Sequence, residues 1–150
     1  TLTSVTALAL RDRNAAFPLL MQMPLYPKAD SSRSYASFSA FSQGYGLDAP
    51  DIAYFVEALA ADDHSPRQSP ILGDLAGLPP TLLVTAALDP LRDEGRAYAA
   101  KAIQAGVDVS YVELAGTIHG CFTFRKAIPS AQEDLTQVLA LAGQMLAKMR

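Results

Sequence analysis

Several residue types and patterns are scarce in this sequence, and each scarcity excludes a class of protein. The 150 residues hold one cysteine, Cys121, which excludes a disulfide framework and a cysteine-rich metal site. No apolar run reaches the roughly 20 residues of a membrane-spanning helix, so we expect no membrane span. Only 18% of the residues are charged, the net charge is −3 and no basic block occurs, so we expect no nucleic-acid partner.

Apolar residues are abundant by comparison. They make up 50% of the chain, which is enough to bury a substantial core and excludes intrinsic disorder. The length fits one ordinary domain. The charged fraction lies below the roughly 25% of a typical soluble protein, so the surface of these residues carries few charges.

The hydrophobic pattern alternates between short continuous apolar runs and segments with helical spacing. A continuous run predicts a buried strand, and apolar residues spaced by three and four predict a helix. We therefore predict strands over residues 17–26, 81–87 and 107–114, and helices over residues 2–10, 51–61 and 135–149. Pro90 at a helix start and Gly106 as an αL cap predict a further helix that runs to about residue 105. Residues 31–50 are predicted to be a loop, and residues 62–80, rich in proline and glycine, a long surface connection. Strand, helix and strand in succession imply parallel pairing and an α/β fold.

Two polar residues follow neighbouring predicted strands. Asp89 comes after the strand at 81–87, and His119 follows the strand at 107–114 through a short turn. Functional groups of parallel sheets gather beyond the carboxyl ends of strands, which lie about 4.8 Å apart. An aspartate that orients an imidazole is the acid–base half of a hydrolytic triad. Two structural alternatives stay open: Asp89 as the cap of the next helix, and His119 as a turn residue bonded to backbone.

A longer motif surrounds these two residues. The sequence DPLRDEG at residues 89–95, followed by HGCF at residues 119–122, resembles the acid and base motifs of the hormone-sensitive-lipase-like carboxylesterases. Other short matches keep the family's order over nearly the whole chain. The sequence departs from the common pattern at Cys121, where phenylalanine often stands.

The resemblance implies a fold, a reaction and a division of roles. The fold is the C-terminal half of an α/β-hydrolase, in which the last three parallel strands of the sheet are flanked by helices. The reaction is hydrolysis of a small-molecule carboxylic ester by a Ser-His-Asp triad, with Asp89 as the catalytic acid and His119 as the general base. Asp93 becomes a supporting residue at the start of a helix. No cofactor and no metal ion is implied, and the Asp-Asp-His run at 62–64 is predicted to be a solvated loop.

The nucleophile that such a triad needs is missing from the sequence. None of the serines has a glycine two residues before and two residues after it, so no GxSxG elbow occurs, and there is no HGGG-type oxyanion loop. The predicted helix at 2–10 begins without a capping residue, and in the family such a helix follows the elbow directly. We therefore expect residues 1–150 to be the C-terminal part of one catalytic domain, with the elbow upstream of residue 1. We expect this chain to be inactive alone and to need its own N-terminal half as a partner.

The resemblance also suggests a substrate wall, a dimer interface and a location. Phe38, Phe41 and Phe55 fall in the stretch that covers the active site in the family, so we predict that they contact the substrate; core packing beneath a loop is the alternative. Members of the family often dimerise through their last strand, which makes residues 107–114 the predicted interface of a homodimer. The scarcity of cysteine favours a cytoplasmic location.

A rival hypothesis comes from a different class of protein. In it, the chain is a small non-enzymatic α/β binding or interaction domain in which Asp89 and His119 have structural roles. The two hypotheses differ in what precedes residue 1, because only the esterase hypothesis requires a GDSAGG-like stretch there.

Overall fold

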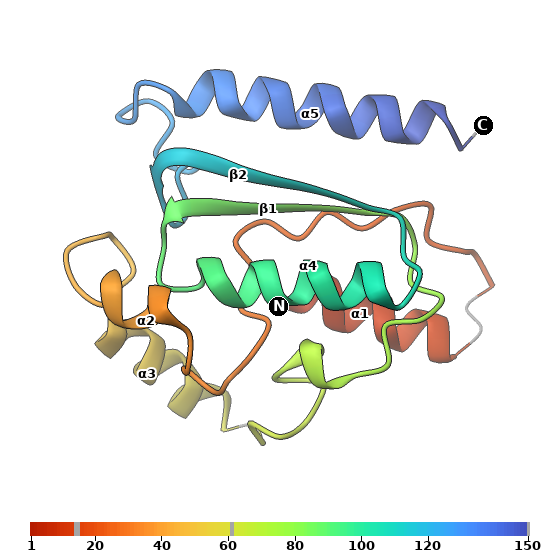
Figure 1. The fold of residues 1–150 in the computed structure, drawn as a ribbon, viewed down its shortest axis with the longest axis horizontal. Helices are drawn as coiled ribbons and strands as arrows, with labels where there is room; N and C mark the ends of the chain where they lie inside the picture. The colour runs from red at the N-terminus through yellow and green to blue at the C-terminus, as the bar shows by residue number, and fades with distance from the viewer. Residues whose placement is uncertain (14–15, 61, 150) are drawn as a thin grey trace.

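A pair of parallel strands forms the centre of the molecule (Figure 1). The computed structural model describes three stretches of the chain: residues 1–13, 16–60 and 62–149. Strand β1 (Thr81–Leu88) pairs with β2 (Val109–Ile118), and α4 (Arg92–Gln104) connects them. The predicted strand–helix–strand unit with parallel pairing is therefore confirmed.

Helices cover both faces of this sheet. Helix α5 (Ala131–Ala147) lies on one side, and α4 with α1 (Leu2–Asp12) lies on the other (Figure 1). Leu83 of β1 belongs to the same buried cluster as residues of α1 and α4, whereas Leu82 and Val84 belong to the cluster that α5 completes. Alternate residues of a strand point to opposite faces, so β1 is buried on both sides, which explains its nearly continuous apolar run.

The predicted strand at 17–26 does not form. Residues 22–25 lie parallel to β1 through two isolated bridges, so the described part of the chain has two strands instead of the expected three. Pro24 lacks an N–H group and cannot continue a ladder of hydrogen bonds. At the start of the segment, Phe17 and Leu20 are 85% and 62% exposed, so this part of the apolar run is not buried.

The segment predicted to be a loop at 31–50 contains helical structure. Helix α2 (Ala36–Ala40) lies within it, and α3 (Ala49–Leu59) begins before the predicted start at residue 51. The Asp51 carboxylate accepts a hydrogen bond from the backbone N–H of Asp48 at 3.1 Å. Asp51 is therefore a third-position partner in a capping arrangement, and the helix starts ahead of it.

The connection predicted to run over the surface at 62–80 is partly buried. It contains a single 3₁₀ turn, η1 (Pro70–Leu72), and the side chains of Ser69 and Leu75 are inaccessible to solvent. Its carbonyl groups find partners in long side chains: Arg11 of α1 donates to Asp74 and Ala76, and Lys101 of α4 donates to Ile71 and Gly73. A segment without regular structure can be buried here because these cations satisfy its backbone.

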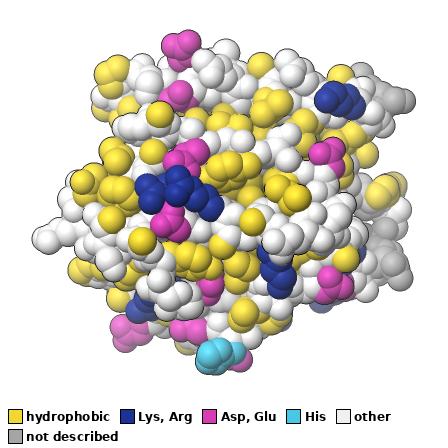
Figure 2. Space-filling view, in the orientation of Figure 1, with side chains coloured by type: hydrophobic (Ala, Val, Ile, Leu, Met, Phe, Trp, Pro, Cys, Tyr) yellow, Lys and Arg dark blue, Asp and Glu magenta, His cyan; other side chains and the backbone are white. Residues whose placement is uncertain are grey.

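Charged side chains are sparse on the surface. On the face drawn in Figure 2 they form small groups among many hydrophobic atoms. Leu2 of α1 and both Tyr54 and Leu59 of α3 are mostly exposed.

No helix in the described residues is long and apolar enough to cross a membrane.

Candidate active site

An irregularity in the sheet places the two candidate catalytic residues side by side. The strands pair in register as far as Ala86 and Leu114; the register then shifts by two residues, so that Leu88 lies opposite Ile118. Strand β2 thus continues past residue 114, where the sequence predicted its end. Gly116, with a φ of +67°, lies in the shifted stretch. Asp89 and His119, the residues after Leu88 and Ile118, are brought together by this shift.

Asp89 and His119 form a hydrogen-bonded pair. Asp89 Oδ2 lies 2.8 Å from His119 Nδ1, and Asp89 Oδ1 accepts the backbone N–H of Leu91 at 2.8 Å. The Asp89 carboxylate is 1% exposed, whereas the His119 side chain is 30% exposed. With an ionised aspartate, Nδ1 carries the proton, so Nε2 is the nitrogen left to act on another group. The two oxygens of Asp89 thus bind the backbone before α4 and the imidazole. Helix α4 itself follows Leu91 without a side-chain cap, so Asp89 is not the cap of this helix.

A tyrosine to which the sequence analysis gave no role in the site packs beside this pair. The ring of Tyr26 lies 5.4 Å from the imidazole of His119 and 5.6 Å from the ring of Phe122, centroid to centroid. Its hydroxyl lies 3.1 Å from Cys121 Sγ, and burial, together with this thiol contact, raises the pKa of Tyr26. Its position at the end of the apolar run at 17–26, the first predicted strand of the sheet, was the available signal.

Asp93 and Ser37 fasten α2 to the first turn of α4. The hydroxyl of Ser37 donates to the carbonyl of Pro90 at 2.9 Å and accepts the N–H of Asp93 at 3.1 Å. In return, the Asp93 carboxylate accepts the N–H of Ser37 at 3.0 Å. Burial acts to raise the pKa of Asp93, but hydrogen bonds from Arg92 and Ser37 hold it below its usual value. The structure thus gives Asp93 a supporting position at the helix start.

Glu94 is a second buried carboxyl in the same motif. It is 2% exposed, and its Oε1 accepts the N–H of Ala29 at 2.6 Å and that of Asp30 at 3.4 Å. Burial raises the pKa of Glu94 to about 8, against the opposing effect of these N–H groups. Glu94 therefore joins α4 to the chain that follows Tyr26.

A cavity of about 180 Å³ opens beside His119. Its remaining lining is Tyr26, Lys28, Leu47, Ile52, Phe55, Val56, Leu59 and Leu91. Of the three phenylalanines predicted to contact substrate, Phe55 lines this cavity. Phe38 instead packs against the core cluster behind it, and Phe41 lies 5.0 Å from the ring of Tyr45 with the Arg92 guanidinium 5.1 Å above it. The structure brings one of the three phenylalanines to His119 and leaves two away from the cavity.

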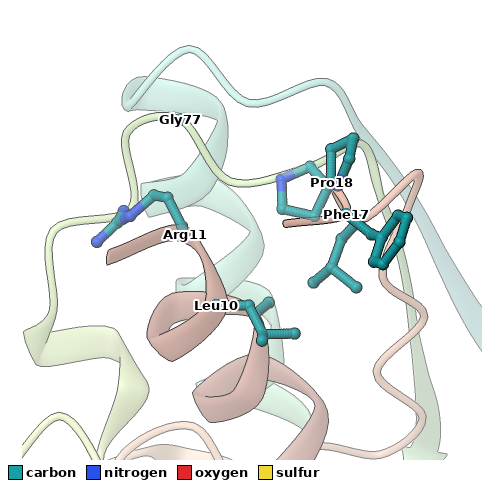
Figure 3. Close-up of a pocket in the computed structure, with 8 residues that line it drawn as sticks. Leu10, Arg11, Phe17, Pro18 and Gly77 are labelled. Carbon is teal, nitrogen blue, oxygen red and sulfur yellow. The ribbon is translucent and has the colours of Figure 1, made fainter. Parts of the chain in front are cut away.

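A second cavity, of about 240 Å³, lies near the amino end of β1. Figure 3 shows its labelled lining: Leu10 and Arg11 on α1, Phe17 and Pro18 on the chain that follows, and Gly77 on the loop before β1. The lining has no acidic residue, histidine or serine. In the described residues, no group of three metal-ligating side chains gathers anywhere.

Comparison with known proteins identifies the family to which this chain belongs. A family model described as alpha/beta hydrolase fold matches residues 1–123. The chain is 36% identical over 138 residues to the ethyl acetate hydrolase of Pseudomonas putida. This match covers 89% of this chain and 43% of that protein. It is 32% identical over 147 residues to the arylesterase of Saccharolobus solfataricus. This match covers 95% of this chain and 46% of that protein.

Solved structures give the same result. An ester hydrolase from the metagenome of Lake Arreo, solved with a derivative of bipyridine phosphonate, has a TM-score of 0.86 and 40% identity over 97% of this chain and 46% of that chain. An esterase of Pyrobaculum calidifontis has a TM-score of 0.81 and 32% identity, and covers 97% of this chain and 48% of that chain. The chain therefore spans less than half the length of the relatives it matches. It belongs to the α/β-hydrolase fold family and, within it, to the hormone-sensitive-lipase-like group.

Proposed function

We propose that this chain is the acid–base part of a carboxylic ester hydrolase of the serine type. The observation that carries the proposal is the hydrogen bond of 2.8 Å between Asp89 and His119 beyond the carboxyl ends of β1 and β2. Asp89 acts as the catalytic acid of the triad and His119 as its general base. The names of the relatives, which include ester hydrolases and an arylesterase, support this class of reaction.

The reaction proceeds by two proton transfers at His119 Nε2 for each acyl transfer. Nε2 takes the proton of a serine hydroxyl as the serine oxygen bonds to the ester carbonyl carbon. It then gives that proton to the alcohol oxygen as the carbon–oxygen bond of the ester breaks. Water repeats the two steps on the acyl-serine and releases the carboxylic acid. Asp89 stays ionised throughout and stabilises the imidazolium. The scheme requires no cofactor and no metal ion.

We propose that the nucleophilic serine and the oxyanion donors belong to an N-terminal half of the same catalytic domain, of which residues 1–150 are the C-terminal part. The relatives support this because the matches cover 43% and 46% of their length. The absence of a GxSxG elbow from the 150 residues supports it independently. Exposed apolar side chains on α1 and at Phe17 are available to pack against such a partner.

The proposed substrate is a small carboxylic ester, held against the largely apolar cavity beside His119. Phe55 lines that cavity and contacts the substrate in this proposal. Phe38 packs on a cluster of residues that also line the cavity, whereas Phe41 contacts Tyr45 and Arg92 instead. A homodimer through β2 and a cytoplasmic location complete the proposal. The first is supported by the position of β2 at the edge of the described sheet, and the second by the single cysteine.

A chimera tests the function directly. Residues 1–150 replace the matching part of the Lake Arreo ester hydrolase, and hydrolysis of p-nitrophenyl acetate is followed for the chimera, for this chain alone and for the host half alone. We expect turnover by the chimera and none by either part. Turnover by this chain alone would contradict the proposal, and so would a chimera that unfolds cooperatively but has no activity. The second outcome would favour the non-enzymatic domain.

A further inference from the structure

The turn that carries His119 is built around one side chain, that of Tyr26. Two aromatic contacts and one polar contact join them. The imidazole of His119 lies 5.4 Å from the Tyr26 ring at an interplanar angle of 56°, and Phe122 lies 5.6 Å away at 58°. Between these two residues, Cys121 places its sulfur 3.1 Å from the tyrosine hydroxyl. Three of the four residues at 119–122 thus contact a single side chain.

The backbone of Tyr26 is held in an unusual conformation. Its φ is +47°, in the left-handed region, which a bulky residue seldom adopts. Its N–H donates to the carbonyl of Val84 in β1 at 2.8 Å, which ties the residue to the sheet. Such strain persists only where surrounding contacts impose it, and it is concentrated at functional sites.

The bond to Asp89 leaves the imidazole incompletely oriented. The hydrogen bond at Nδ1 holds one edge of the ring, and coupled changes of the two side-chain torsions of His119 can still rotate the ring plane while that bond is kept. The direction in which Nε2 points depends on this rotation. The ring of Tyr26, half-buried and itself packed on Phe122, limits it from one side.

We infer that Tyr26 is a positioning residue for His119: its ring sets the plane of the imidazole so that Nε2 faces the substrate cavity, which both residues line. The hydroxyl has a smaller part, because it contacts the Cys121 sulfur and so steadies the turn. This contact also accounts physically for a cysteine at residue 121, since a phenylalanine there offers no polar atom to the hydroxyl. The inference rests on the proposed esterase function.

The test compares three variants in the active enzyme that contains this chain. Tyr26→Leu removes ring and hydroxyl, Tyr26→Phe removes the hydroxyl alone, and Tyr111→Leu is the matched control, since Tyr111 of β2 bonds to Thr85 and Glu113 and not to the turn. A catalytic group misplaced by about 1 Å loses on the order of 10²-fold in rate. We expect Tyr26→Leu to lower kcat by about that factor with a smaller change in KM. We expect Tyr26→Phe to retain most of the kcat and Tyr111→Leu to leave kcat unchanged.

Proton NMR of the imidazole gives a readout that does not depend on turnover. The ring signals of His119 shift in Tyr26→Leu, because the aromatic ring beside them is lost, and stay near their original positions in Tyr111→Leu. If Tyr26→Leu does not fold, Tyr26→Phe decides, since a loss of rate on the order of 10²-fold in that variant contradicts an orienting role of the ring.

Failure of the inference can be told apart from failure of the proposed function. Unchanged kcat in Tyr26→Leu, while His119→Ala abolishes turnover, overturns the role of Tyr26 and leaves the esterase proposal standing. Unchanged turnover in His119→Ala overturns both.

Discussion

The two ends of the β1–β2 sheet bury different kinds of polar group. At the carboxyl end, the carboxyl groups of Asp89 and Glu94 are almost inaccessible. At the amino end, the buried polar residues are neutral: Gln22 donates to the Thr81 hydroxyl at 2.9 Å. Burying an ionisable group costs far more than burying an amide or a hydroxyl, and it is tolerated where hydrogen bonds compensate. The carboxyl end is therefore the one where the molecule bears a cost in stability.

The backbone follows the same division. The strands pair in regular register from Thr81 and Val109 onward, and the shift comes only after Ala86. The ring of the strained Tyr26 also contacts His119 at the carboxyl end. Irregularities of strands are common next to active sites because they redirect side chains. The contrast indicates that the regular end holds the sheet together while the irregular end carries the proposed acid–base pair.

The largest effect should come from neutralising Asp89. Asp89→Asn can orient the imidazole only in the wrong tautomer, so we expect kcat of the complete enzyme to fall by about 10⁴-fold. Asp108→Asn makes the same change at the amino end, where that side chain is exposed, and should leave kcat unchanged. Steady-state kinetics on the two variants measures the contrast; equal losses in both would show that Asp89 acts through overall charge and not through His119.

An intermediate effect should separate two glycines at opposite ends of the sheet. Gly116 and Gly106 have φ angles of +67° and +81°, and an added Cβ meets no atom within 4 Å at either position. Alanine at each should therefore cost about 1–2 kcal/mol of unfolding free energy through backbone strain alone. Only Gly116 lies in the shifted stretch, so Gly116→Ala should also lower kcat, by less than Asp89→Asn does. Urea unfolding and kinetics test the pair; a kcat loss in Gly106→Ala would break the distinction.

The smallest effect at neutral pH should come from Glu94→Gln, and the quantity it changes is the free energy of unfolding. Burial raises the pKa of Glu94 to about 8, above its ordinary value of 4.5, so the folded state holds a proton that the unfolded state has lost. The free energy of unfolding should then fall as the pH rises from about 4.5 to about 8, and level off above that. Glu94→Gln should remove this slope while keeping an acceptor for the Ala29 N–H. Unfolding curves across this pH range measure it, and the same slope in the variant would exclude Glu94 as its source.

Local patterns in the sequence were enough for most of the fold. Residues within a few positions of one another carry the apolar run of β1, the helical spacing of α1 and α5, and the Pro90 and Gly106 signals that flank α4. The predictions failed where a distant partner decided the outcome. Residues 17–26 resemble a strand, but Pro24 interrupts the pairing with β1; the 62–80 connection is buried because Arg11 and Lys101 reach its carbonyls.

The candidate site divides in the same way. The sequence by itself determined which two residues could form an acid–base pair, because both follow buried strands and stand in the DPLRDEG and HGCF motifs. Only the tertiary structure decided that they meet, that Tyr26 packs on the imidazole, and that Phe55 alone of the three phenylalanines lines the cavity. The reason is physical: the register of two strands depends on hydrogen bonds between residues about thirty positions apart, and no local periodicity encodes a shift of two residues within them.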